Sequence, residues 1–127
     1  VAPEVALAEL REFIEGRVLV GHFVHIDMKA LRKELGDQQH ELTNPAIDTA
    51  KAHRWILQNS PWREDLEQQM ANISLAALAG IYNLEFHEAH HALDDAFVTA
   101  RLWQKQISRL EDLKICSLGD VLRVAKV

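Results

Sequence analysis

The chain has 127 residues, of which 48% are hydrophobic and 26% are charged, as is typical of one globular domain. Its single cysteine, Cys116, excludes an intramolecular disulfide and a zinc site built from several cysteines. The formal net charge of −5 gives no basic footprint for stable nucleic-acid binding, although bound cations can cancel an acidic site. No apolar stretch reaches the roughly 20 residues that span a bilayer. We therefore expect a cytoplasmic protein with no membrane partner.

Most of the chain is predicted to be helical, because apolar residues recur along it at spacings of three and four. Pro3 suits the first turn of the first helix, and Gly16 ends that helix. The stretch over 59–72 is polar and shows no regular pattern. The residues of the longest helix that are expected to face the core are Ala96, Phe97, Ala100, Leu102 and Trp103. The expected helices cover residues 3–16, 27–35, 49–57, 74–82 and 92–110, and a weaker helical pattern occupies the tail over 111–127.

Only two short strands are predicted, at residues 17–22 and 45–49. The first is a continuous apolar run before a glycine, which is typical of a parallel strand covered on both faces. Asp48 or Thr49 is expected to cap the helix that follows the second strand. Two strands do not make an independently stable sheet, and an open edge invites pairing. Because the chain also begins at Val1, we expect an α/β fold that is N-terminally incomplete.

Two carboxylates and one histidine stand out as candidates for chemistry. His90 lies five positions before Asp95 in the run His-His-Ala-Leu-Asp-Asp-Ala, at the start of a predicted helix. Asp27 lies far upstream and ends the run Val-Gly-His-Phe-Val-His-Ile-Asp. Carboxylate oxygens suit Mg²⁺ or Mn²⁺, and an imidazole with a pKa near neutrality can take a proton from an attacking water. This set suits metal-assisted hydrolysis of a phosphodiester.

These runs resemble motifs of the DnaQ-like 3′–5′ exonucleases, which include the proofreading subunit of bacterial DNA polymerase III and ribonuclease T. Residues 19–31 are similar to the second motif of that family. Residues 90–96 are similar to the third motif of its histidine subclass, H-x-x-x-x-D-A. The Asp-Thr pair within 47–49 and the stretch 74–84 match two further family features, and all four occur in the family's order.

The resemblance implies a ribonuclease-H-like α/β fold and two divalent ions, Mg²⁺ or Mn²⁺, held by four carboxylates. It implies hydrolysis of single-stranded or 3′-terminal DNA or RNA from the 3′ end. Asp27 and Asp95 match metal ligands, and His90 matches the general base. A partial exonuclease domain would then cover residues 1–110, followed by the tail over 111–127. The implied partners besides nucleic acid are a DNA polymerase and a missing N-terminal segment.

Candidate substrate contacts lie beside Asp27. His22, Phe23 and His25 all fall between the predicted strand and the helix that carries this carboxylate. Phe23 departs from the family, which commonly has asparagine after Gly-His. The family's first motif, an Asp-x-Glu on an earlier strand, is also absent. The only Asp-x-Glu here, over 65–67, follows the second motif and is not expected to be a ligand pair.

Several alternatives stay open at this point. Asp27 could cap its helix, Asp95 could be a solvated charge, His91 competes with His90 as the base, and Asp94 is expected to be a surface or supporting group. For His22 and His25 a structural role is more common than contact with substrate. For Asp48 a helix cap is more common than a metal ligand. The rival functions are a catalytically inactive module that binds nucleic acid or a partner protein, and a helical interaction domain with coincidental motifs. The sequence does not choose between DNA and RNA.

Overall fold

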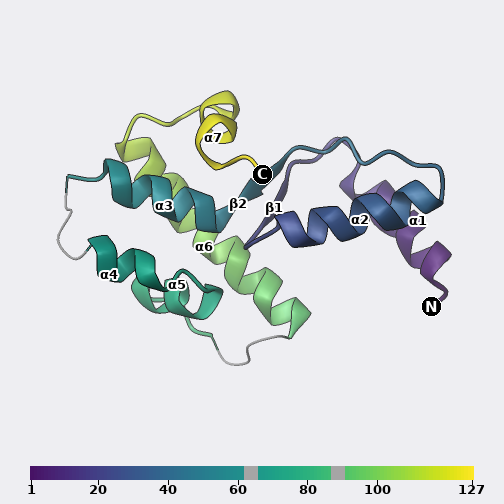
Figure 1. Ribbon diagram of the computed structural model, residues 1–127, viewed down its shortest axis with the longest axis horizontal. Helices are drawn as coiled ribbons and strands as arrows, with labels where there is room; N and C mark the ends of the chain where they lie inside the picture. The colour runs from purple at the N-terminus through teal and green to yellow at the C-terminus, as the bar shows by residue number, and fades with distance from the viewer. Residues whose placement is uncertain (62–65, 87–90) are drawn as a thin grey trace.

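A computed structural model of the chain describes residues 1–61, 66–86 and 91–127, without the side chains of 66–68. In Figure 1 the two short strands lie near the middle of the molecule, with α1 and α2 to one side and most of the remaining helices to the other. The elements described are α1 (Pro3–Ile14), β1 (Leu19–Gly21), α2 (His25–Asp37), β2 (Ala46–Asp48), α3 (Thr49–Asn59), α4 (Leu66–Ala71), α5 (Leu75–Ile81), α6 (Ala92–Asp112) and α7 (Leu118–Ala125).

The two strands form a parallel pair in which Leu19 lies opposite Ala46 and Gly21 lies opposite Asp48. Their carboxyl ends therefore meet at one edge of the sheet. All of β2 is buried, whereas β1 is only partly covered and Val20 is 36% exposed. The prediction that the first strand is covered on both faces is wrong for this structure, because Val20, in the middle of β1, is 36% exposed.

The C-terminal tail lies along the edge of β2 that β1 does not use. The Val127 N–H donates to the Ala46 carbonyl at 3.0 Å, and Lys126 forms an antiparallel bridge with Ile47. Just before it, α7 packs against α3 and β2, and Ala125 is fully buried. The tail is helical, as its sequence pattern predicted.

The long helix α6 crosses the molecule and packs against α3, α5 and β1. Leu102 faces the core as predicted, but Phe97 is 64% exposed, and Ala96 and Ala100 are exposed with it. Hydrophobicity alone misplaced the stripe, because two polar residues lie on the buried face. The buried residues of α6 are Val98, Thr99, Leu102, Gln106 and Leu110.

One described helix was not predicted. The six-residue α4 lies within the polar stretch over 59–72, where no apolar periodicity marks it. The other predicted elements are present with shifted ends; for example, α2 begins at His25 rather than at Asp27. No helix in the described ranges is long and apolar enough to cross a membrane.

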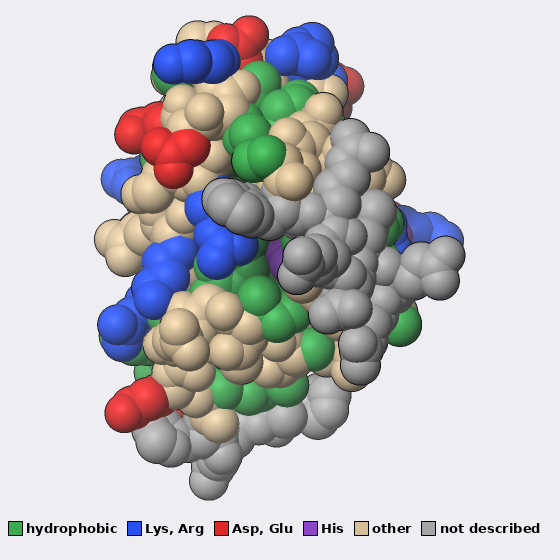
Figure 2. Space-filling model, turned by 90° about the vertical axis from the view of Figure 1, so that its left-hand side faces the viewer, with side chains coloured by type: hydrophobic (Ala, Val, Ile, Leu, Met, Phe, Trp, Pro, Cys, Tyr) green, Lys and Arg blue, Asp and Glu red, His purple; other side chains and the backbone are tan. Residues whose placement is uncertain are grey.

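Charge is distributed unevenly over the surface. Figure 2 shows Lys and Arg side chains gathered in a band on one face, with Asp and Glu side chains toward its margins. The formal net charge of −5 is therefore an average that does not describe each face.

Candidate active site

The candidate site begins with a tight turn that connects β1 to α2. A Cβ added to Gly21 would lie 2.6 Å from Cγ2 of Val24, so the turn closes only around a glycine. Val24 is buried and is the residue from which α2 starts. Between them, Phe23 has a backbone φ of 52°, in the left-handed region that a phenylalanine rarely adopts. This turn sets the direction in which α2 leaves the sheet.

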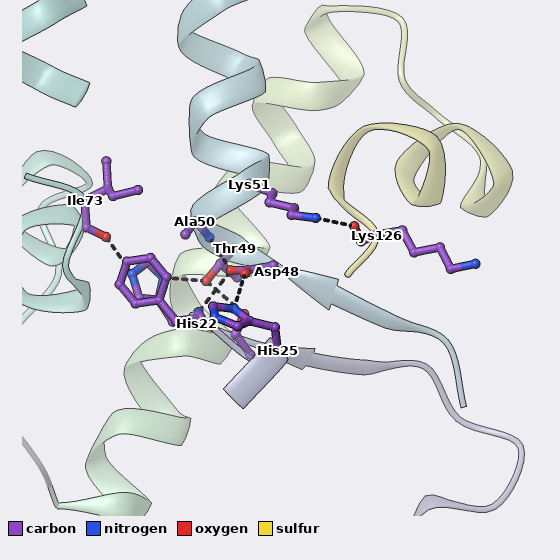
Figure 3. A network of polar contacts seen from close by, with 10 residues as sticks. His22, His25, Asp48, Thr49, Ala50, Lys51, Ile73 and Lys126 are labelled. Atoms are coloured by element: carbon purple, nitrogen blue, oxygen red, sulfur yellow. Dashed lines mark hydrogen bonds and ion pairs between the residues drawn. The ribbon is translucent and has the colours of Figure 1, made fainter. Parts of the chain in front are cut away.

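Asp48 holds this turn against the start of α3. Its carboxylate is buried, and Oδ1 accepts the Phe23 N–H at 3.0 Å and the Ala50 N–H at 2.9 Å. The second of these bonds makes Asp48 the N-cap of α3, which confirms the predicted cap. Its Oδ2 lies 3.9 Å from Nδ1 of the exposed His25. Figure 3 shows His25 and Asp48 facing each other at the ends of the two strands.

His22 links the same turn to two other parts of the chain. Its Nε2 lies 2.7 Å from the Ile73 carbonyl, and its Nδ1 lies 2.8 Å from the Thr49 hydroxyl (Figure 3). Because a carbonyl only accepts, Nε2 must carry the proton. Burial lowers the pKa of His22, against the opposing effects of the Ile73 carbonyl and the Asp48 charge. The neutral ring then has an acceptor at Nδ1, which competes with the Gly21 carbonyl, 3.3 Å away, for the single proton of the Thr49 hydroxyl. We call His22, Phe23, Asp48 and Thr49 the strand-end network.

A second set of buried polar groups supports this network from behind. The Gln106 side chain donates to the Thr49 carbonyl at 2.8 Å, which links α6 to the first residue of α3. His53 is fully buried, and its Nδ1 lies 3.1 Å from the Tyr82 hydroxyl. Burial first, and then the charges of Arg109 and His22, lower the pKa of His53 to about 4. The sequence analysis missed these supporting residues, since isolated polar residues within helices carry no recognisable spacing.

The two predicted carboxylates lie in the first turns of two helices. Asp27 is exposed on α2, whose N-cap is Val24, so the alternative that Asp27 caps this helix is wrong. Asp95 is partly buried on α6, and its Oδ1 is buried without a hydrogen bond from any described residue. Nearby, His91 Nδ1 lies 3.3 Å from Asp94 Oδ2, so these two side chains pair with each other.

The structure brings the two carboxylate-bearing helices together through β1, which leads into α2 and packs against α6 (Figure 1). Within the described part of the chain, no hydrogen bond or ion pair joins Asp27 to Asp95. His90, the predicted base, lies outside the described residues. The same holds for Asp65 of the Asp-x-Glu run and for the side chain of Glu67.

A family model described as "Exonuclease", of the ribonuclease T type, matches residues 2–103. The chain belongs to this exonuclease family, and with it to the DnaQ-like nucleases, which are hydrolases. The family implies a ribonuclease-H-like α/β fold, with which two parallel strands flanked by helices are consistent. No solved structure matches the chain significantly.

Three bacterial DNA polymerase III proteins are similar to this chain. DNA polymerase III subunit epsilon of Aquifex aeolicus is 29% identical over 84% of the chain and 48% of the relative. DNA polymerase III PolC-type of Caldanaerobacter subterraneus is 25% identical over 93% of the chain and 8% of the relative. The PolC-type protein of Clostridium perfringens is 31% identical over 84% of the chain and 7% of the relative. The chain thus spans about half of the epsilon subunit and less than a tenth of the larger relatives.

Exonucleases of this family generally use divalent metal ions, so the described residues can be tested for their fit to one. The buried Oδ1 of Asp95 has no donor among the described residues, and a carboxylate oxygen is the ligand that Mg²⁺ prefers. The exposed Asp27 carboxylate is of the same kind. No group of three or more His, Cys, Asp or Glu side chains in the described ranges could hold an ion. The carboxylates of Asp27 and Asp95 are therefore suitable ligand types for a divalent metal ion, but a complete site needs further ligands.

A groove of about 880 Å³ runs between the end of α1, the loop over 40–45 and the start of α7. None of its lining residues belongs to the strand-end network, and neither Asp27 nor Asp95 is among them. We place the candidate site at the strand ends because open α/β sheets bind ligands where parallel strands end, and Asp27 lies in the first turn of the helix that follows β1.

Proposed function

We propose that this chain carries part of the active site of a metal-dependent 3′–5′ exonuclease. Asp27 and Asp95 would hold divalent ions, Mg²⁺ or Mn²⁺, and His90 would act as the general base. The observation that carries the proposal is the buried Asp95 Oδ1, which no described residue satisfies. An unpaired buried carboxylate is costly, and a cation removes that cost.

The metals, when bound, would stabilise the charge that develops on the attacking and leaving oxygens. The residues of this chain would supply placement. Asp48 fixes the turn that leads to Asp27, and His22 ties that turn to α3 and to the segment before α5. Asp95 is held rigidly one turn into α6, whose buried face is anchored by Leu102 and Gln106. Rigid support of this kind keeps ligands in their productive geometry.

The substrate would be a single strand of DNA or RNA with a free 3′ end. Association with a DNA polymerase is the partner that the DNA polymerase III relatives suggest. Because the described carboxylates are too few for two ions, we propose that further carboxylates come from a segment that pairs with the free edge of β1.

The test uses the full-length protein and 5′-labelled oligonucleotides of DNA and of RNA. With Mg²⁺ or Mn²⁺ we expect a ladder of products shortened from the 3′ end. Asp95→Asn and His90→Ala should each lower the rate by more than about 100-fold, the upper range for losing a residue that merely supports a ligand. Asp94→Asn and His91→Ala are the matched controls and should retain most activity.

A second candidate function is a catalytically inactive module that binds nucleic acid or a partner protein. The observation in its favour is the lack of a group of three metal-ligating side chains in the described ranges. Full-length protein that shows no hydrolysis, and no rise in melting temperature with millimolar Mn²⁺, would establish it.

Unchanged hydrolysis in Asp95→Asn would contradict the proposed site.

A further inference from the structure

We propose that the Phe23 ring is a stacking platform for a base near the 3′ end of the substrate, and that it makes the site tolerant of base identity. This inference rests on the proposed function, since it assigns to that site the way in which it holds a single strand.

The backbone conformation of Phe23 has no ordinary explanation. Four described residues other than glycine have a positive φ. Three of them directly follow the C-caps of α2, α5 and α6, where a left-handed residue commonly ends a helix. Phe23 instead precedes a helix, so its left-handed conformation does not serve to end one. A strained residue that the surroundings hold in place points to a functional role. The other three residues are Gln39, Asn83 and Lys114.

The surroundings fix Phe23 on both sides. Its N–H donates to Asp48 Oδ1 at 3.0 Å, and its carbonyl accepts the Ile26 N–H at 3.2 Å. Its ring lies against the His22 ring, with centroids 4.5 Å apart and planes tilted by 59°. Because hydrogen bonds engage both His22 nitrogens, the surface beneath Phe23 is itself immobile. A ring that is already fixed before binding loses little conformational entropy when a ligand binds.

The position of Phe23 suits a contact with substrate. It follows the carboxyl end of β1 and lies four residues before Asp27, on a turn where the side chain stays partly exposed. Ile26, on the same turn, is 64% exposed, so this end of α2 presents apolar groups beside a proposed metal ligand. An apolar surface next to a charged site is what a nucleotide needs, because its base is flat and its phosphate is ionic.

The chemistry of the ring sets the kind of recognition. Every base has a π-face, so stacking on an aromatic side chain is tolerant of sequence. A phenyl ring has no hydrogen-bonding group with which to distinguish base edges. Asparagine would adopt a positive φ with less strain than phenylalanine and would carry an amide. This chain therefore has an aromatic ring at position 23 even though the backbone there is strained.

The experiment compares two 5′-labelled DNA oligonucleotides, one normal and one with abasic sites at its last two 3′ positions. Binding to full-length protein is measured by fluorescence anisotropy with Ca²⁺ in place of Mg²⁺. We expect the wild type to prefer the base-bearing strand by about tenfold or more. Phe23→Leu and Phe23→Asn should lose that preference, and Phe23→Trp should keep it. Phe97→Leu, at an exposed ring on α6, is the matched control and should behave like the wild type.

The melting temperature supplies an independent readout. Phe23→Asn should raise it, because asparagine relieves the backbone strain, so weaker binding by this variant cannot come from unfolding. A full preference retained in Phe23→Leu would overturn the stacking role and leave the exonuclease function intact. A wild-type protein that cuts neither DNA nor RNA would overturn the proposed function instead, and its binding preference would still decide the role of Phe23.

Discussion

The strand-end network and the carboxylates Asp27 and Asp95 differ in how their polar atoms are used. In the network, Asp48 accepts two backbone N–H groups and both nitrogens of His22 are engaged. In contrast, Asp27 is exposed, and the buried Oδ1 of Asp95 receives nothing from the described residues. This difference indicates that the network residues maintain the structure of the site, whereas the two carboxylates remain available to bind a ligand. Substitutions in the first set should affect stability, and those in the second should affect chemistry.

The largest effect on stability is expected from Asp48→Ala. Loss of this carboxylate leaves the N–H groups of Phe23 and Ala50 without their acceptor in a buried environment. We expect a loss of about 3 kcal/mol in the free energy of unfolding, measured by urea denaturation. Asp48→Asn keeps an acceptor oxygen and should lose about half as much. A change below about 0.5 kcal/mol in Asp48→Ala would contradict the importance of the network.

A smaller loss is expected from Gly21→Ala. The added Cβ would meet Val24 at 2.6 Å, so the turn must open, at a cost of about 2 kcal/mol. Gly36→Ala is the matched control, because a Cβ at this exposed position of α2 meets nothing within 4 Å. It should stabilise the protein by about 0.5 kcal/mol through helix propensity. If both variants shift the urea midpoint in the same direction, the close approach at Gly21 is not what limits the turn.

The pH dependence should show the buried histidines behind the network. The pKa of His53 is lowered to about 4 in the folded state, so the unfolded chain takes up a proton first as the pH falls. Stability is then complete above about pH 6.5 and falls between about pH 6.5 and pH 4, by on the order of 3 kcal/mol. His53→Phe should flatten this part of the curve. His40→Gln, in the loop after α2, should leave it unchanged.

The smallest effect on stability is expected from Asp95→Asn. This carboxylate makes no described side-chain hydrogen bond, so its loss should change the free energy of unfolding by less than about 0.5 kcal/mol. The same variant should lose the metal-induced rise in melting temperature. A destabilisation of more than about 1 kcal/mol would mean that Asp95 supports the fold, and the comparison with Asp48 would then fail.

Much of this arrangement was predictable from local patterns. The cap at Asp48 and the helical tail follow from short-range rules, and the structure confirms them. The roles of His90, Asp95 and Asp27 came from motif resemblance and stay predictions. The buried face of α6 was misjudged, because Thr99 and Gln106 are buried by partners distant in sequence.

The supporting residues around the site were not predictable for the same reason. His22 contacts the carbonyl of Ile73, and no spacing rule relates residues 51 positions apart. His53 likewise lies beside Tyr82 only because α3 and α5 meet in the fold. The strain at Phe23 depends on the Asp48 acceptor, which lies 25 residues away. Local sequence determines helices and caps, whereas these contacts depend on tertiary packing.

The long sequence separations within the strand-end network also bear on how the chain folds. Its hydrogen bonds join residues 25, 27 and 51 positions apart, and the bond from Gln106 to Thr49 spans 57. Contacts of this range form slowly, because the loops between them must close first. We expect the helices to form early and the turn that aims Asp27 to be fixed last. A chain still being folded would then have both carboxylates but not their final placement.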